Sequence, residues 1–340
     1  MKHSHNNWWH TLHYLKRFLA EMKDKKLKED VKRRPSSLQE EENRDKVYIG
    51  IDLGGTRIKG VLINEKGKIL HQVYTPTNDG NSTVWKNAVA ATVKELQLKT
   101  NQIKPVIGIS APGISNVQNT AIAFLPDRLQ GLENFIWGDF LMQETFVLND
   151  AVAALMAEAK LGAAKNRKHV ILLTLGTGVG GAILIDGKPY QGAFHKAGHL
   201  GHITLDHEAE RDITGTPGSL EDAVGNATIE RRSLGKFKYT HELTEACRQG
   251  DYFAQWLWLS SIRKLAIGIA SLTNALSPEC VILAGGITEA GKQLFEPLES
   301  FLALYEWRAG GNKTEIIKAE FGDLAGAIGA ACFAMSKFDN

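Results

Sequence analysis

Two glycine-rich turns, each between two β-strands, constrain the fold of this chain more than any other feature. The first lies in VYIGIDLGGTRIKGVLIN, residues 47–64, and the second in VILLTLGTGVGGAILI, residues 170–185. Apolar and β-branched residues flank both turns, which is typical of a strand, a turn and a second strand. Neither turn leads directly into a helix, so neither fits the dinucleotide or Walker patterns, which need a strand, a loop and a helix. The repeat predicts a chain with two similar halves.

The sequence around these turns alternates strand and helix patterns. We predict helices and strands as follows: a helix over 84–98, strands over 106–110 and 145–148, the Ala-rich helix AVAALMAEAKLG, a strand over 280–283 and the helix LAGAIGAACFAM. This order predicts an α/β fold of two domains with a cleft between them. We expect domains over 46–150 and 151–321, the second being larger, with a C-terminal helix at about 322–338 packed on the first.

Residues 1–45 differ in composition from the rest of the chain. Apolar residues recur at helical spacing from Trp8 to Met22, and an almost entirely polar stretch follows. Residues 1–34 carry a surplus of six positive charges, so the remaining chain has a net charge of −4 although the whole chain has +2. We predict a basic extension, partly helical or disordered, without a catalytic role; a helix that binds a membrane surface or a partner is the alternative. The acidic body argues against a nucleic-acid partner.

The cysteines and the hydropathy of the sequence indicate in which compartment the protein works. The three cysteines, Cys247, Cys280 and Cys332, are far apart and form no CxxC pair. They indicate neither a disulfide framework nor a thiolate metal site, and we expect a cytoplasmic protein. No apolar run reaches the roughly 18 residues of a membrane span, so we expect no membrane partner.

The residues of the two turns suit the binding of phosphate groups. Glycine backbone can approach an anion closely, while a hydroxyl, a cation and a carboxylate complete the first turn. A plain β-hairpin is the alternative for either turn alone. Two such turns in one chain favour a clamp on a polyphosphate, and its candidate residues are Asp52, Gly54, Gly55, Thr56 and Lys59 in the first and Gly176, Thr177, Gly178 and Gly180 in the second.

Polar residues elsewhere are candidates for catalysis and substrate binding. Asn149 and Asp150 lie between a strand and a helix, where either could be a helix cap, but a carboxylate at this position could also accept a proton from a substrate hydroxyl. His195, His199 and His202 lie close together in GAFHKAGHLGH. We favour hydrogen bonding of His202 to a polyhydroxylated ligand over metal binding, and the role of His199 stays open.

Seven blocks, DLGGTRIKG, ISAPG, LNDA, LGTGVGG, AGHLGH, TGTPGSLEDAVGN and ILAGGI, follow one another in this order. In that order they resemble the ROK family of sugar kinases, within the actin-like, hexokinase-type ATPase superfamily, from about Val47 to Met335. The resemblance implies two actin-like, ribonuclease H-like domains. It implies a glucokinase-like phosphotransferase that uses ATP and Mg²⁺, and a homodimer.

The resemblance also implies roles for single residues. The two turns would hold the ATP phosphates, Gly285 and Gly286 would lie near the nucleoside, and Asp52 would help to place the magnesium shell. Asp150 would be the general base. Asn149, His199, His202 and Glu221 would lie at the sugar. No residue is assigned as a direct metal ligand.

Two departures from the family pattern concern the sugar site. The family usually has Glu where this chain has His199, so the preferred sugar could be unusual. Many relatives hold a structural zinc through a histidine and three cysteines; Asp212, Thr214 and Ser219 stand at the cysteine positions here, so we expect no zinc.

The leading hypothesis is phosphorylation of glucose to glucose 6-phosphate. An N-acetylhexosamine kinase, a sugar-responsive transcription regulator and a non-catalytic sugar sensor are the alternatives. Polyphosphate in place of ATP also stays open.

Overall fold

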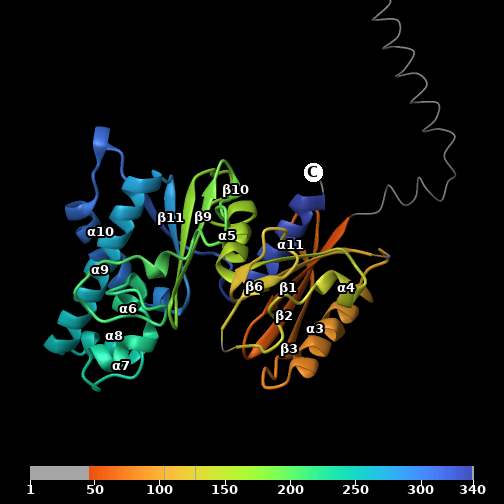
Figure 1. Cartoon of the computed structure of the whole chain (residues 1–340). Helices are drawn as coiled ribbons and strands as arrows, with labels where there is room; N and C mark the ends of the chain where they lie inside the picture. Colours follow the sequence, from red (N-terminus) through yellow and green to blue (C-terminus); the bar gives the residue numbers. More distant parts are fainter. Residues whose placement is uncertain (1–45, 103, 127, 339–340) are drawn as a thin grey trace, which may run out of the picture. The chain divides into compact units, whose positions relative to one another are not determined.

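Two five-stranded sheets with the same topology form the centre of the protein (Figure 1). The computed structural model describes residues 46–102, 104–126 and 128–338; the predicted extension, residues 1–45, lies outside the described residues. Residues Lys46–Asn340 belong to one compact unit. The first sheet has the order β3-β2-β1-β4-β7, with β1 (Val47–Leu53), β2 (Arg57–Asn64), β3 (Ile69–Pro76), β4 (Val106–Ala111) and β7 (Thr145–Asn149). The second has the order β10-β9-β8-β11-β12, with β8 (Val170–Leu175), β9 (Val179–Ile185), β10 (Lys188–Pro189), β11 (Cys280–Ala284) and β12 (Glu315–Lys318).

The pairing of the strands repeats as well as their order. In each sheet three strands pair antiparallel and two further strands extend the sheet in parallel. The two glycine-rich turns join β1 to β2 and β8 to β9, as the sequence predicts, and Asp52 is paired with Lys59 across the first. A smaller sheet of β5 (Ile114–Ser115) and β6 (Ile122–Phe124) follows β4. The α/β class is thus the predicted one.

Helices cover both faces of each sheet. The helices are α3 (Ser82–Gln97), α4 (Trp137–Leu141), α5 (Asp150–Lys160), α6 (Leu220–Val224), α7 (Ile229–Arg232), α8 (Thr240–Arg248), α9 (Tyr252–Leu276), α10 (Lys292–Tyr305) and α11 (Ala325–Phe338). Helix α3 begins two residues before the predicted start because the Asn81 side chain caps it, accepting from the N–H groups of Thr83 and Val84. Its buried residues, Trp85 and Val89 among them, pack on the first sheet.

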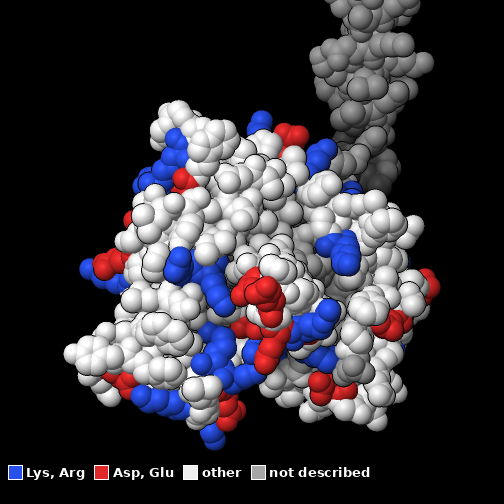
Figure 2. All heavy atoms as spheres, turned by 60° about the vertical axis from the view of Figure 1, so that its left-hand side comes forward, with Lys and Arg blue, Asp and Glu red and all other residues white. Residues whose placement is uncertain are grey.

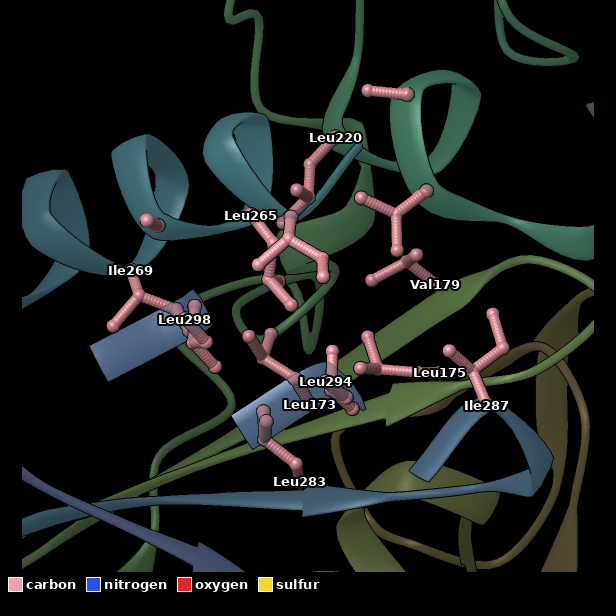
Figure 3. Packing of buried hydrophobic residues seen from close by; sticks show 14 of the residues in the cluster. Leu173, Leu175, Val179, Leu220, Leu265, Ile269, Leu283, Ile287, Leu294 and Leu298 are labelled. Carbon is pink, nitrogen blue, oxygen red and sulfur yellow. The ribbon is translucent and has the colours of Figure 1, made fainter. Parts of the chain in front are cut away.

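Helices α9 and α10 pack on the outer face of the second sheet (Figure 3). Leu173 and Leu283 from the strands meet Leu265 and Leu294 from the helices in a continuous apolar cluster. Each of these four side chains is at most 1% exposed. Burial of one such leucine stabilises the fold by about 1.5–3 kcal/mol.

Helices α5 and α11 lie between the two sheets and pack on each other. Helix α11 lies against β1 and β4 of the first sheet, and α5 lies against β8 and β9 of the second. Glycines allow the close approach: a Cβ on Gly108 would lie 1.9 Å from the Ala330 carbonyl oxygen, and one on Gly329 would lie 1.6 Å from that of Ala153. The small residues of the final helix therefore serve packing between backbones.

The buried carboxylate of Glu158 fastens the segment that leads into α11. Its Oε1 accepts from the N–H groups of Glu320 and Phe321 at 2.8 and 3.0 Å, and its Oε2 accepts from Ala163 N at 2.9 Å. Glu158 is fully buried. These bonds hold the loop between β12 and α11 in a fixed position.

Candidate functional site

A cavity of about 750 Å³ lies where the ends of β1, β11 and the loop before α11 meet the start of α5. Six of the residues predicted to bind phosphates or nucleoside, or to act as the base, line it together: Asp52, Gly54, Lys59, Asp150, Gly285 and Gly286. Figure 2 shows acidic side chains gathered near the centre of one face, with basic side chains on both sides of them. The lining of the cavity itself includes carboxylates, Asp52 and Asp150, and a cation, Lys59, as a phosphate-transfer site would need.

Asp150 is the first residue of α5, and its neighbour Asn149 caps this helix. The Asn149 side chain accepts from the N–H groups of Ala151 and Val152, and its amide donates to the Gly113 carbonyl oxygen at 2.9 Å. Asn149 therefore fixes where the helix begins, which is the plainer of its two predicted roles.

The Asp150 side chain lines the cavity and is exposed there, although the surrounding protein still withdraws its carboxylate from bulk water. Burial and then the negative charge of Asp52 raise its pKa to about 6, although the Ala151 N–H and the positive charge of Arg128 act in the opposite direction. A carboxylate with a pKa of about 6 remains ionised at neutral pH and accepts a proton more readily than an ordinary aspartate.

Lys59 is the centre of an ion-pair network at the first turn. Its ammonium group lies 3.3 Å from Asp52 Oδ2 and 2.8 Å from Asp323 Oδ1, and Ser110 Oγ donates to the other Asp52 oxygen at 2.8 Å. Burial lowers the pKa of Lys59, but the hydrogen bonds and charges of Asp323 and Asp52 raise it overall, so the side chain stays charged. Thr77, fully buried, donates to the Gly54 carbonyl oxygen and holds the turn in place.

The second turn lines an adjoining cavity of about 420 Å³. Gly176 and Thr177 lie on its wall, and Gly286 and Glu289 belong to both cavities. The two turns thus open onto adjacent spaces. Gly178 and Gly180 line neither cavity, and neither do Gly55 and Thr56 of the first turn.

Gly285 needs to be glycine for two reasons. Its φ is +91°, and a Cβ there would lie 2.4 Å from the Leu175 carbonyl oxygen. The end of β11 can therefore approach the end of β8 closely, which brings Gly286 and Thr177 to the same cavity.

Four of the predicted sugar-binding residues line neither cavity: Asn149, His199, His202 and Glu221. Glu221 Oε2 accepts from the Val179 N–H at 2.9 Å, so this carboxylate braces the second turn. His202 Nδ1 lies 2.8 Å from Asp212 Oδ2. The pKa of His199 is lowered by burial and by the neighbouring His202 and Lys196, which favours a neutral imidazole.

Hydrogen bonds link His202, Thr214 and Ser219 to the carboxylate of Asp212. Burial raises the pKa of Asp212, but hydrogen bonds from His202, Thr214 and Ser219 hold it well below its ordinary value overall. Because an ionised carboxylate only accepts, Nδ1 of His202 carries the hydrogen. Among the described residues no group of three or more His, Cys, Asp or Glu could hold a metal ion.

Sequence reasoning did not find several residues of the cavities. Arg128, Asp323, Glu289 and Lys318 line the main cavity, and Thr240, His241 and Arg248 line the second. Asp323 follows a parallel strand at its carboxyl end, a position that commonly forms sites in α/β sheets and could have pointed to it. No motif marks Arg128.

Among the described helices, none is long and apolar enough to cross a membrane.

The chain is similar to known sugar kinases over most of its length. The ROK family model matches residues 48–337. A glucokinase of Thermotoga maritima is 33% identical over 307 residues, which cover 83% of this chain and 95% of the relative. An N-acetylmannosamine kinase of Escherichia coli is 29% identical and covers 85% of this chain, with 98% of the relative matched.

Solved structures agree with these relatives. A ROK hexokinase from Thermus thermophilus superposes with a TM-score of 0.78 at 29% identity, covering 86% of this chain and 99% of the hexokinase. A ROK glucokinase from Streptomyces griseus, in complex with glucose and AMPPNP, gives a TM-score of 0.69 at 24% identity, covering 85% of this chain and 99% of the glucokinase. The predicted actin-like fold of two domains is confirmed. The chain therefore belongs to the ROK family, and within it to the sugar kinases.

Proposed function

We propose that the protein transfers the γ-phosphoryl group of ATP to a hexose hydroxyl, with glucose as the first candidate acceptor and glucose 6-phosphate as the product. The observation that carries this proposal is the main cavity, in which the Asp150 carboxylate, the Lys59 ammonium and the Gly54 turn face a common space. The similarity to a glucokinase and the glucose and AMPPNP in the Streptomyces complex support the choice of substrates.

In the proposed reaction Asp150 accepts the proton of the sugar hydroxyl. The sugar oxygen forms a bond to the γ-phosphorus, and the bond from this phosphorus to the β–γ bridging oxygen breaks, so ADP leaves with the electron pair. Lys59 and the Gly54 turn neutralise phosphate charge, and the protein acts mainly by alignment and charge stabilisation. An aspartate pKa of about 6 suits the base, because the carboxylate is ionised at pH 7.

Mg²⁺ fits this cavity only together with the donor phosphates. Asp52 offers one carboxylate whose oxygens already accept from Ser110 and Lys59. Mg²⁺ is commonly bound by one or two carboxylates, several waters and substrate phosphates, and such a set needs no cluster of protein ligands. Asp52 would hold the metal, which would neutralise charge on the phosphates.

The second cavity is the proposed place of the nucleoside. Its volume of about 420 Å³ and its wall of Thr177, Gly286, Thr240 and His241 suit a purine ring and a ribose next to the phosphate space. In this arrangement Gly285 and Gly286 lie near the nucleoside, as the resemblance implies.

The test is a coupled assay of ADP release with ATP and a panel of glucose, mannose, fructose, N-acetylmannosamine and N-acetylglucosamine. We expect turnover with at least one of these sugars and a loss of about 10²–10⁴-fold for Asp150→Asn, the usual contribution of a general base. A parallel series with inorganic polyphosphate identifies the donor. Equal turnover by Asp150→Asn would contradict the proposed base.

Glucose is the acceptor to test first because the glucokinase is the relative of higher identity. His199 stands where the family usually has Glu, and a neutral imidazole can donate one hydrogen bond and accept another, whereas a carboxylate only accepts. A preference for N-acetylmannosamine over glucose in the panel would therefore assign a different sugar without changing the reaction.

We also propose a homodimer in the cytoplasm. The dimer rests on the family resemblance, and the compartment rests on the three free cysteines. Light scattering of the purified full chain measures the first directly.

A further inference from the structure

Arg128 lies over the first glycine-rich turn although it is distant from it in the sequence. It belongs to the segment between β6 and α4, and the buried side chains of Leu129 and Leu132 anchor this segment in the core of the first sheet. The Arg128 Nη2 atom lies 2.7 Å from the position that a Cβ on Gly55 would occupy. The absence of a side chain at Gly55 therefore leaves room for the guanidinium group.

Arg128 differs from the other cations of the main cavity in its partners. Lys59 is bound to Asp52 and Asp323, and Lys318 forms an ion pair with Glu289 at 2.9 Å. Arg128 lines the same cavity and has neither an ion pair nor a side-chain hydrogen bond within the part of the chain that the structure describes. The positive charge of Arg128 nevertheless acts on the Asp150 carboxylate and lowers its pKa.

A guanidinium in this position suits one class of ligand. Its planar set of five N–H donors matches phosphate oxygens in a bidentate manner. Within the described residues this cation has no ion-pair partner, although the Asp79 carboxylate also lies near the Gly55 position. It lies between the first glycine-rich turn and the Asp150 carboxylate and is available for an anion that arrives with the substrate.

We propose that Arg128 binds the transferred phosphoryl group above the Gly54–Gly55 turn and stabilises the charge that develops on it during transfer to the sugar. This inference rests on the proposed kinase function. The sugar oxygen attacks the γ-phosphorus, ADP departs with the electrons of the broken P–O bond, and the sugar proton passes to Asp150. Arg128 donates N–H groups to the γ-phosphate oxygens throughout and is not itself changed.

The test compares Arg128→Lys, Arg128→Gln and Arg128→Ala with the native chain in the coupled kinase assay. A cationic donor directed at a transferring phosphoryl group contributes on the order of 10³-fold to kcat, and loss of one aligned donor costs about 10²–10³-fold. We therefore expect kcat of Arg128→Gln to fall by about that factor while the KM of the sugar changes little. Arg128→Lys retains the charge but not the bidentate geometry, so it should lie between the native chain and Arg128→Gln.

Two further measurements separate this role from a structural one. The acidic limb of the kcat/KM profile of Arg128→Gln should move to higher pH, because a positive charge that lowers the pKa of Asp150 is removed. Free guanidinium ion should partly restore kcat of Arg128→Ala. Lys94→Gln is the matched control, since Lys94 is exposed on α3 of the same half of the molecule, outside the main cavity, and its loss removes the same charge.

The outcomes are distinguishable from failure of the kinase proposal itself. If the native chain phosphorylates no sugar of the panel, the kinase proposal fails. If the native chain is active and Arg128→Gln matches it in kcat and in pH profile, the role of Arg128 is overturned. A drop in kcat that Lys94→Gln shares equally would also overturn it.

Discussion

At the scale of single residues, the chemistry depends on how neighbours set the pKa of Asp150. Burial and the charge of Asp52 raise it to about 6, and Arg128 acts against them. Removal of the Asp52 charge and removal of the Arg128 charge should therefore shift the pKa of Asp150 in opposite directions.

Asp52→Asn should lower the pKa of Asp150, because it removes the nearby negative charge. The native kcat/KM should fall about tenfold per pH unit below about pH 6, where Asp150 becomes protonated. The kcat/KM of the variant should begin this fall at a lower pH. A rate profile between pH 4.5 and 8.5 measures this shift. An acidic limb that stays in place for both Asp52→Asn and Arg128→Gln would show that Asp150 is not the titrating base.

Asp150→Asn should remain folded, so its loss of activity can be read as chemistry. A carboxyl whose pKa is raised in the folded state contributes stability below its unfolded pKa and loses it as the pH rises through about 6. At pH 8 the neutral amide should therefore leave the protein at least as stable as the native chain. Thermal unfolding at pH 8 measures this, and a lower Tm for the variant would contradict it.

Asp212→Asn should disturb His202, for which the family resemblance implies a contact with the sugar. Asp212 accepts from His202 at 2.8 Å, and hydrogen bonds to a charged group contribute about 1.5–3 kcal/mol each. We expect a lower free energy of unfolding in urea and a higher KM of the sugar, with kcat affected less. Asp206→Asn, an exposed carboxylate in the same loop, is the control and should leave both values unchanged.

At the scale of elements, the ends of strands carry the site. The second turn and the end of β11 meet because Gly285 lets them approach, with a Cβ position 2.4 Å from the Leu175 oxygen. This meeting brings the two cavities together.

Gly285→Ala should therefore raise the KM of ATP and lower the free energy of unfolding by more than the roughly 1–3 kcal/mol that strained backbone alone costs. Gly250→Ala is a matched control, because Gly250 has a φ of +86° but nothing within 4 Å of its Cβ position. The control carries the backbone strain alone, so the difference between the two variants measures the close approach. Equal KM values of ATP in both variants would contradict this role of Gly285.

Much of the arrangement of strands and turns can be predicted from the sequence. The two hairpins and the strands that end just before Asp150 and Gly285 have strong local patterns, and the structure has them at β1–β2, β8–β9, β7 and β11. The positions of Arg128 and Asp323 do not follow, because long-range packing brings them to the cavity from segments without a motif. The bond between Glu221 and Val179 is likewise a tertiary contact that spacing in the sequence does not reveal.

At the scale of the whole molecule, stability depends on the contact between α5 and α11. Gly329→Ala would place a Cβ 1.6 Å from the Ala153 carbonyl oxygen, so the two helices would have to separate. We expect a loss of about 3 kcal/mol or more in urea unfolding, although alanine favours a helix over glycine. Gly138→Ala in α4 is the control, because its nearest atom lies 3.4 Å away. Similar unfolding midpoints for the two variants would contradict this importance of the helix contact.

The repeated topology explains why these helices are central. Each sheet carries one of them on its inner face, so the connection between the two halves is helix against helix and not strand against strand. The sequence predicts the repeat, but it does not predict that a small-residue helix at the end of the chain packs beside the Ala-rich helix that starts at Asp150.

This contact has a mechanical consequence. Large side chains interlock across most helix pairs and resist sliding, whereas alanine and glycine present nearly smooth surfaces to each other. Small displacements along a smooth surface are the basis of shear motions between packed helices. The same glycines that let α5 and α11 approach closely also let them slide past each other, so a substrate-driven closure would move along this contact without disrupting the apolar core on either side.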